Sequence, residues 1–194
     1  NGFGFKADYD FGNSQTNNGA AQGAAASVFY KSKLFDAGIA YKHNNNSTGS
    51  AVNGSAYGAP SFTADATYDN YIVGANIKPM AGLQIAGAWQ RVDVDNGKTS
   101  DYQDSWALGA TYQVGKLTYK LAAGQILESD KGVDNGAWQV NGGVAYALSK
   151  QTQVQFGLNY IDNDDKATGL IGTDTGLKNA AAGGKTMAGV FALR

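Results

Sequence analysis

A two-residue alternation of apolar and polar side chains recurs along most of this chain and limits what it can fold into. The first such segment, residues 3–11, has apolar side chains at Phe3, Phe5, Ala7, Tyr9 and Phe11. Successive side chains of a β-strand point to opposite faces, so a period of two predicts strands with one apolar face. No segment has the 3.6-residue period of an amphipathic helix. The alternation therefore predicts an all-β chain.

Short polar turns join four pairs of alternating segments, a pattern typical of antiparallel hairpins. The paired segments are 27–30 with 34–42, 71–77 with 83–90, 106–112 with 117–126, and 138–146 with 154–161. Two further segments, 3–11 and 187–194, bring the total to about ten strands. Longer segments rich in Asn, Gly, Ser, Asp and Thr join the hairpins, at 12–23, 44–66, 94–103, 128–136 and 163–184. We expect an antiparallel meander in which residues 1–194 form a single domain.

A soluble β-sandwich also has alternating strands, but three features favour a transmembrane β-barrel. Short turns alternate with long loops, aromatic residues recur at the ends of the expected strands, and the polar face carries small residues and amides. Tyrosine and tryptophan rings suit the two membrane–water interfaces, where they form girdles. The predicted girdle residues are Tyr30, Tyr41, Tyr71, Trp89, Trp106, Tyr112, Trp138, Tyr146 and Tyr160. We expect the chain in the bacterial outer membrane.

Composition excludes several other classes of protein. The 194 residues carry 15 basic and 16 acidic side chains, so the charge gives no support to nucleic-acid binding. The absence of cysteine excludes disulfides, thiolate metal sites and cysteine nucleophiles. Mean hydropathy is −0.32, and no apolar run approaches the ~18 residues of a membrane helix. A search for long apolar runs does not detect barrel strands, because only every second residue of such a strand is apolar.

Several short runs resemble the Gram-negative general porin family. They are residues 3–9, 27–30, 157–160 and 189–194, together with the turn at 147–154. That turn is the most specific, because it is similar to a Leu-Ser-Lys-Arg-Thr phrase before the penultimate strand of many such porins, with Gln151 in place of arginine. The resemblance implies a sixteen-stranded, usually homotrimeric barrel that forms a water-filled channel for passive diffusion of small hydrophilic solutes and ions.

The resemblance covers only the C-terminal part of that family. The family's terminal phenylalanine, its early strands and its constriction loop with a Pro-Glu-Phe type motif have no counterpart here. We therefore expect the later portion of a longer porin, with a small ten-stranded barrel as the alternative. The implied partners are outer-membrane lipid and lipopolysaccharide, two further copies of the chain, and the solutes themselves. No cofactor is expected.

A channel of this kind needs a polar lumen whose charges bias the passage of ions. The alternation predicts inward charges at Lys6, Asp8, Asp10, Asp36, Lys42, Lys78, Lys120 and Arg194. Among these, Lys6, Lys42 and Lys120 are expected to lie deep enough to matter; the alternative is that they are solvated charges near the barrel ends. Small inward residues would keep the bore open, namely Gly38, Gly74, Ala86, Ala88, Gly109, Ala122, Gly124 and Gly157.

One charge breaks the pattern of the apolar face. Arg91 is in phase with Ile85 and Trp89, so it must either reach water at the interface or contact another subunit. The loops are acidic, which would suit divalent cations that bridge lipopolysaccharide phosphates. Segments 92–97 and 162–165 are similar to calcium loops but lack the full ligand spacing. Solvated loop carboxylates are the expected interpretation, and no metal site is predicted.

Two other functions remain open from the sequence. An omptin-like protease would have to use His43, the only histidine, near Asp65 or Asp69. No motif of that family is visible, so we do not expect an enzyme. An adhesin or receptor would use the loops at 44–66 and 163–184, which contain few aromatic residues and favour solvated loops over a preformed recognition surface.

Overall fold

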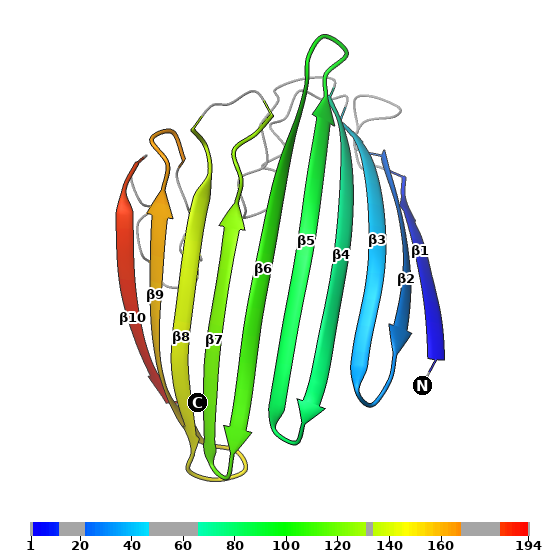
Figure 1. Ribbon diagram of the computed structural model, residues 1–194. Coiled ribbons are helices and arrows are strands. Elements are labelled where there is room, and N and C mark those ends of the chain that lie inside the picture. Colours follow the sequence, from blue (N-terminus) through cyan, green and yellow to red (C-terminus); the bar gives the residue numbers. More distant parts are fainter. Residues whose placement is uncertain (1, 12–21, 47–65, 131–133, 168–182, 194) are drawn as a thin grey trace.

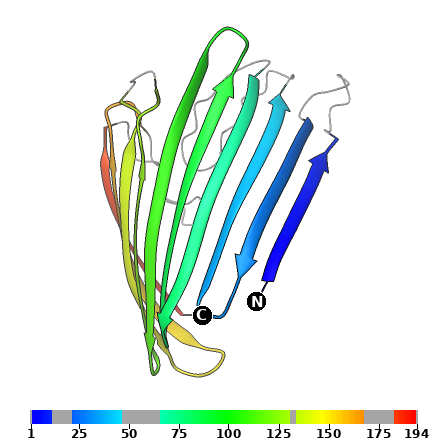
Figure 2. The same ribbon diagram turned by 45° about the vertical axis from the view of Figure 1, so that its right-hand side comes forward.

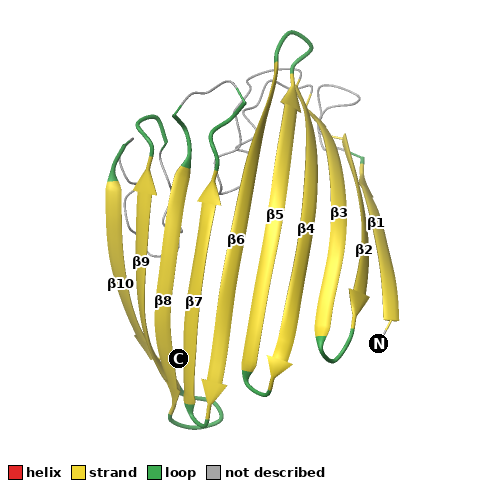
Figure 3. Cartoon of the chain, viewed as in Figure 1, coloured by secondary structure: helices red, strands yellow, loops and turns green. Residues whose placement is uncertain are grey.

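The computed structural model of the chain describes residues 2–11, 22–46, 66–130, 134–167 and 183–193. These residues form ten strands (Figures 1 and 3): β1 (Gly2–Asp10), β2 (Gln22–Lys31), β3 (Phe35–Asn46), β4 (Ala66–Met80), β5 (Leu83–Asp95), β6 (Ser100–Val114), β7 (Leu117–Ile126), β8 (Ala137–Ala147), β9 (Gln153–Asn163) and β10 (Lys185–Leu193). Among the described residues there is no helix with the length and apolarity needed to cross a membrane.

The strands form one sheet in sequence order, and each strand pairs antiparallel with the next. The turned view shows that the sheet curves into a trough (Figure 2). Short turns lie at one end, called the turn end here: 32–34, 81–82, 115–116 and 148–152. The opposite end is called the loop end. The predicted all-β meander of about ten antiparallel strands is confirmed.

The prediction of a long loop at 94–103 was wrong. β5 continues to Asp95 and β6 begins at Ser100, so only residues 96–99 turn. Asn96 closes this turn, because its side-chain Oδ1 accepts hydrogen bonds from the backbone N–H groups of Lys98 and Thr99 at 3.0 and 2.8 Å. The hairpin stands highest at the loop end in Figure 1. Its polar residues suggested a loop because the convex face carries Asp93 and Asp95 here, so the apolar alternation of the lower strand stops.

The strand β4 also differs from its prediction. It runs from Ala66 to Met80, whereas the alternation placed a strand at 71–77 and a turn at 78–82. The turn is shorter than predicted because pairing between β4 and β5 continues beyond Ile77–Ile85. After a shift in register, Met80 pairs with Leu83. The two residues between them, Ala81 and Gly82, make the turn.

The register gives the sheet two chemically distinct faces. Large apolar side chains are exposed along the convex face, where Leu108 and Leu121 are 54% and 61% accessible. Side chains of the concave face are smaller or polar, as in the directly paired series Thr111, Lys120 and Gly143. A small buried cluster of Ala66, Tyr68 and Val94 lies near the loop end of β4 and β5. The sheet is therefore inverted relative to a soluble protein, with apolar side chains outside.

Gly82 gives a testable consequence for the turn between β4 and β5. Its φ is +79°, and a Cβ atom would lie 2.2 Å from the backbone oxygen of Gln113. We expect Gly82→Ala to destabilise the folded protein by about 1–2 kcal/mol, because left-handed strain adds to a clash with rigid backbone. Urea unfolding in lipid vesicles measures the difference.

Gly115 provides the matched control for this prediction. It also has a positive φ, +59°, in the β6–β7 turn, but an added Cβ would have nothing within 4 Å. Gly115→Ala should therefore cost less than Gly82→Ala, since it bears the conformational strain alone. Equal losses for the two variants would contradict the role assigned to the Gln113 contact.

Candidate functional site

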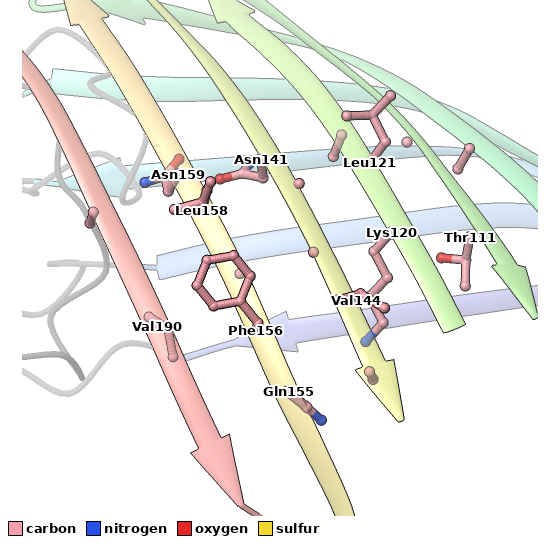
Figure 4. A pocket seen from close by; sticks show the side chains of 18 of the residues that line it. Thr111, Lys120, Leu121, Asn141, Val144, Gln155, Phe156, Leu158, Asn159 and Val190 are labelled. Carbon is pink, nitrogen blue, oxygen red and sulfur yellow. The ribbon is translucent and has the colours of Figure 1, made fainter. Parts of the chain in front are cut away.

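The concave wall between β5 and β10 contains a cavity of about 590 Å³ (Figure 4). Two rows of directly paired residues cross it. The first row contains Gln84, Thr111, Lys120, Gly143, Gly157 and Val190. The second contains Ala86, Gly109, Ala122, Asn141, Asn159 and Ala188. These two rows carry mainly short side chains, amides and one cation, and the apolar residues Leu121, Phe156 and Leu158 also line the cavity.

The predicted inward charges share this concave face where they are described. Lys6 pairs across strands with Ser27, and Ser27 pairs with Ala40, so these three residues share one face. Lys42 lies two residues beyond Ala40 on β3 and is on the same face. No ion pair to Lys6, Lys42 or Lys120 occurs within the described part of the chain. Arg194 lies outside the described residues, and of Asp10 only the backbone, paired with Gly23, is described. That these charges line a pore remains a prediction.

Two of the predicted inward charges neutralise each other near the turn end. The Nζ of Lys78 lies 3.4 Å from the Oδ2 of Asp36, which also accepts a hydrogen bond from Asn76 at 3.3 Å. The other carboxylate oxygen accepts one from the backbone N–H of Ser32 in the β2–β3 turn. This pair therefore contributes little net charge to the trough.

The nine predicted girdle residues all share the convex face and fall into two bands. Tyr30, Tyr112 and Tyr146 lie near the turn end, and Tyr41, Tyr71, Trp89, Trp106, Trp138 and Tyr160 lie farther along their strands. Tilted ring pairs join neighbouring strands in the second band, with ring centroids 5.2 Å apart in both Tyr41–Tyr71 and Trp138–Tyr160. On β8 the bands are eight residues apart, about 27 Å along the strand, a span suited to the apolar layer of a membrane.

The prediction that these aromatic residues mark strand ends was wrong for the second band on β3 to β6. Trp89 and Trp106 pair in the middle of β5 and β6, which continue toward the loop end. Sequence reasoning also missed Tyr119, the direct partner of Tyr112 in the first band. The alternation of Tyr119 with Leu117 and Leu121 was the available signal.

The charge that breaks the apolar face, Arg91, has a partner within the sheet. Its Nε and Nη2 donate to the two carboxylate oxygens of Asp104 at 2.8 and 2.7 Å, and the two residues are direct cross-strand partners. Its guanidinium lies 4.2 Å from the ring centroid of Tyr102 and 5.8 Å from that of Trp89. The charge is therefore paired within the sheet just above the aromatic band, and 36% of the Arg91 side chain stays accessible to a further contact.

The single histidine lies on the same convex face. Its Nδ1 is 2.8 Å from Oδ1 of Asp69, and that oxygen also accepts a hydrogen bond from the Tyr41 hydroxyl at 2.5 Å. Asp65, the other suggested partner, is outside the described residues. Tyr41 and His43 thus bind one carboxylate on the side of the sheet opposite to the cavity.

The two segments similar to calcium loops use their carboxylates in other contacts. Asp95 accepts a hydrogen bond from the backbone N–H of Gly97 at 2.6 Å, and Asp162 pairs with Lys185 at 2.9 Å. Among the described residues, no group of three or more His, Cys, Asp or Glu side chains could hold a metal ion. These two carboxylates are therefore engaged within the β5–β6 turn and across the β9–β10 pair.

Comparison with solved structures defines the class of this fold. The chain is similar to the in-vitro folded OmpT of Vibrio cholerae, an outer membrane protein in trimer form, with a TM-score of 0.70 and 17% identity over 97% of this chain and 60% of that one. A loop L8 deletion mutant of OmpT has a TM-score of 0.70 and 17% identity, over 100% of this chain and 59% of that one. Outer-membrane expressed OmpT has a TM-score of 0.69 and 18% identity, over 99% of this chain and 61% of that one. The fold is that of an outer-membrane β-barrel, and the chain spans about three fifths of these relatives.

The family follows from the sequence match. A family model described as Gram-negative porin matches residues 1–166, so the chain belongs to the Gram-negative porin family. No curated protein matches the chain. Family and fold together confirm the predicted transmembrane barrel class and the bacterial outer membrane as its location. The extent of the domain remains a prediction.

Proposed function

We propose that this chain supplies part of the wall of a water-filled channel through which small hydrophilic solutes and ions diffuse passively. The observation that carries the proposal is the contrast between the two faces of one sheet. The convex face exposes Leu108, Leu121 and Phe191, whereas the concave face carries Lys120, Asn141 and Gln155 around a cavity. Lipid on one side and water on the other are the two solvents that such a sheet requires.

The size of the complete channel belongs to the same proposal. Among the described residues, β1 and β10 each have one neighbour, so each sheet edge leaves backbone groups unpaired. Hydrocarbon does not accept an open edge, because every backbone donor and acceptor there must be satisfied. We propose that further strands close a sixteen-stranded barrel, that three copies assemble, and that lipid and lipopolysaccharide surround them. The trimer form of OmpT supports this assembly for a relative of the same fold.

The proposal assigns no catalysis to this chain. A protease of the omptin kind would need His43 and Asp69 beside a substrate, but they pair on the convex face, and Asp69 is also bound by Tyr41. An adhesin would act through the loops at 44–66 and 163–184, most of whose residues lie outside the described part. The contrast between the two faces favours the channel over both alternatives.

Planar bilayers test the channel. The complete, heat-modifiable protein is expected to produce ohmic, stepwise conductance. Lys120→Glu should shift the reversal potential toward cation selectivity, because it replaces an unpaired positive charge of the concave wall by a negative one. The measurement is the reversal potential in a tenfold KCl gradient. Silent bilayers from correctly folded protein would contradict the channel and favour the adhesin. An unchanged reversal potential in the variant would mean that Lys120 is peripheral.

A further inference from the structure

We propose that the cavity on the concave wall between β5 and β10 is a binding subsite for a small hydroxylated carboxylate such as a sugar acid. Lys120 would bind the carboxylate and Asn159 a hydroxyl group (Figure 4). The inference rests on the proposed function, because it gives the channel a preferred solute at one place on its wall.

The shape of the cavity comes from missing side chains. Gly143 and Gly157 are direct partners on β8 and β9, in the same row as Lys120, so the wall beside the lysine is bare backbone. In the next row Gly109 faces Ala122. The resulting volume of about 590 Å³ is within the range of small-molecule sites in proteins. Aliphatic and backbone surface of this kind can contact the carbon chain of a small solute.

The charge of the cavity selects an anion. Among the described residues that line it, Lys120 is the only charged one. Within the described part of the chain its ammonium group has no carboxylate partner. An unpaired lysine beside a low-polarity wall attracts a carboxylate more strongly than a lysine in bulk water would, since the wall excludes part of the solvent. A carboxylate is therefore the group expected at this end.

At the other end of the cavity, one hydrogen-bond acceptor has no partner among the described residues. The Oδ1 atom of Asn159 is buried and has no hydrogen-bond partner among the described residues. The direct partner of Asn159, Asn141, has its own Oδ1 occupied by a hydrogen bond from Gln139 at 3.0 Å. A buried acceptor without a donor costs free energy, so a ligand hydroxyl gains affinity if rotation of the Asn159 side chain brings this oxygen to the cavity surface. A hydroxyl group supplies this donor without adding charge.

The spacing of the two ends sets the size of the solute. Lys120 on β7 and Asn159 on β9 are separated by the strand β8. Asn159 also lies two residues along β9 from Gly157, which shares the row of Lys120. Those offsets place their Cα atoms about 12 Å apart. Both side chains line the cavity, and Figure 4 shows them on either side of its floor. The gap that remains suits a short carbon chain with a carboxylate at one end and hydroxyl groups beyond it.

The test uses D-gluconate as the probe with the complete protein in planar bilayers. Added gluconate should decrease the chloride current with saturation, and Lys120→Gln should raise the half-saturating concentration about tenfold, the loss expected for one charge-assisted hydrogen bond. Gly157→Val should do the same by filling the floor, where an added Cβ meets only a backbone oxygen at 3.7 Å. Propionate, which has no hydroxyl group, and glucose, which has no charge, should each bind more weakly than gluconate.

Lys116→Gln is the matched control. It removes the same charge from the same β6–β7 hairpin, but Lys116 belongs to the turn and does not line the cavity. The half-saturating gluconate concentration of the Lys116→Gln variant should stay within twofold of that of the parent protein. An equal effect of Lys116→Gln and Lys120→Gln would overturn the subsite in favour of a general field effect.

Different results would contradict the binding subsite and the channel. Open channels whose current shows no saturation with gluconate would overturn the subsite and leave the channel intact. Silent bilayers would overturn the channel, and calorimetric titration of the folded protein with gluconate would then decide the subsite separately. Equal affinity for gluconate and propionate would overturn the role of Asn159, because that role requires a hydroxyl donor.

Discussion

Replacing Leu121 by arginine is expected to cost the folded protein about 2–4 kcal/mol of stability, the penalty for arginine near the middle of a lipid-facing barrel strand. Leu121 lies on the convex face of β7 and is 61% accessible, so under the proposed function its side chain faces lipid. It is two residues from Tyr119 of the first aromatic band. An arginine there must lose its hydration or distort the bilayer to reach water. The measurements are the folded fraction and urea unfolding in vesicles.

The neighbouring position supplies the control for this prediction. Ala122 is adjacent in β7 but lies on the concave face beside Gly109. Ala122→Arg should change the stability far less than Leu121→Arg, because its charge enters water. The comparison isolates the face of the strand, since both variants place arginine at almost the same height. Comparable losses would contradict the assignment of the convex face to lipid.

Breaking the pair between Arg91 and Asp104 gives the second large expected effect. Arg91→Met should destabilise the protein by about 1–3 kcal/mol, because it leaves the half-buried carboxylate of Asp104 without its two charge-assisted hydrogen bonds. This loss is smaller than for fully buried pairs because the Arg91 side chain is 36% accessible and solvent screens part of the interaction. Urea unfolding measures this loss.

A double-mutant cycle separates the pair from the individual side chains. Arg91→Met with Asp104→Leu should cost less than the sum of the single variants, since neither charge is left behind. The pair of Lys185 with Asp162 is the control, because its lysine is 67% accessible and its coupling should be weaker and more sensitive to salt. Additive losses at Arg91 and Asp104 would contradict a net stabilising pair.

The period of two was sufficient to predict faces but insufficient to predict strand lengths. It assigned Lys42 and Lys120 to one side and Leu121 to the other, because alternation in a strand has no other geometric outcome. It failed at Asp93, Asp95 and Asp101, which are strand residues beyond the aromatic bands. Asp93 and Asp95 make the convex face polar there, although Val94 is buried on the other face, so the pattern that identifies a membrane strand disappears while the hydrogen-bonded pairing continues.

The candidate site was predictable residue by residue but not as an arrangement. The sequence indicated Lys120, Gly109, Ala122 and Gly157 as members of one polar, compact face. It did not indicate that Lys120 and Gly157 would share a row, because that depends on the registers of two successive strand pairs. It also gave no signal for the unpartnered oxygen of Asn159, which depends on what surrounds that side chain.

The sequence by itself therefore determined the strand type, the short turns at one end and the two faces of the barrel wall, because these depend on neighbours only a few residues apart. The tertiary structure alone decided which charges are neutralised. Arg91 meets Asp104 across one hairpin, and Lys78 meets Asp36, 42 residues away, across another pair of strands. Curvature and register then leave Lys120 without an ion-pair partner among the described residues and beside a bare floor, since both are properties of the whole sheet and not of any one strand.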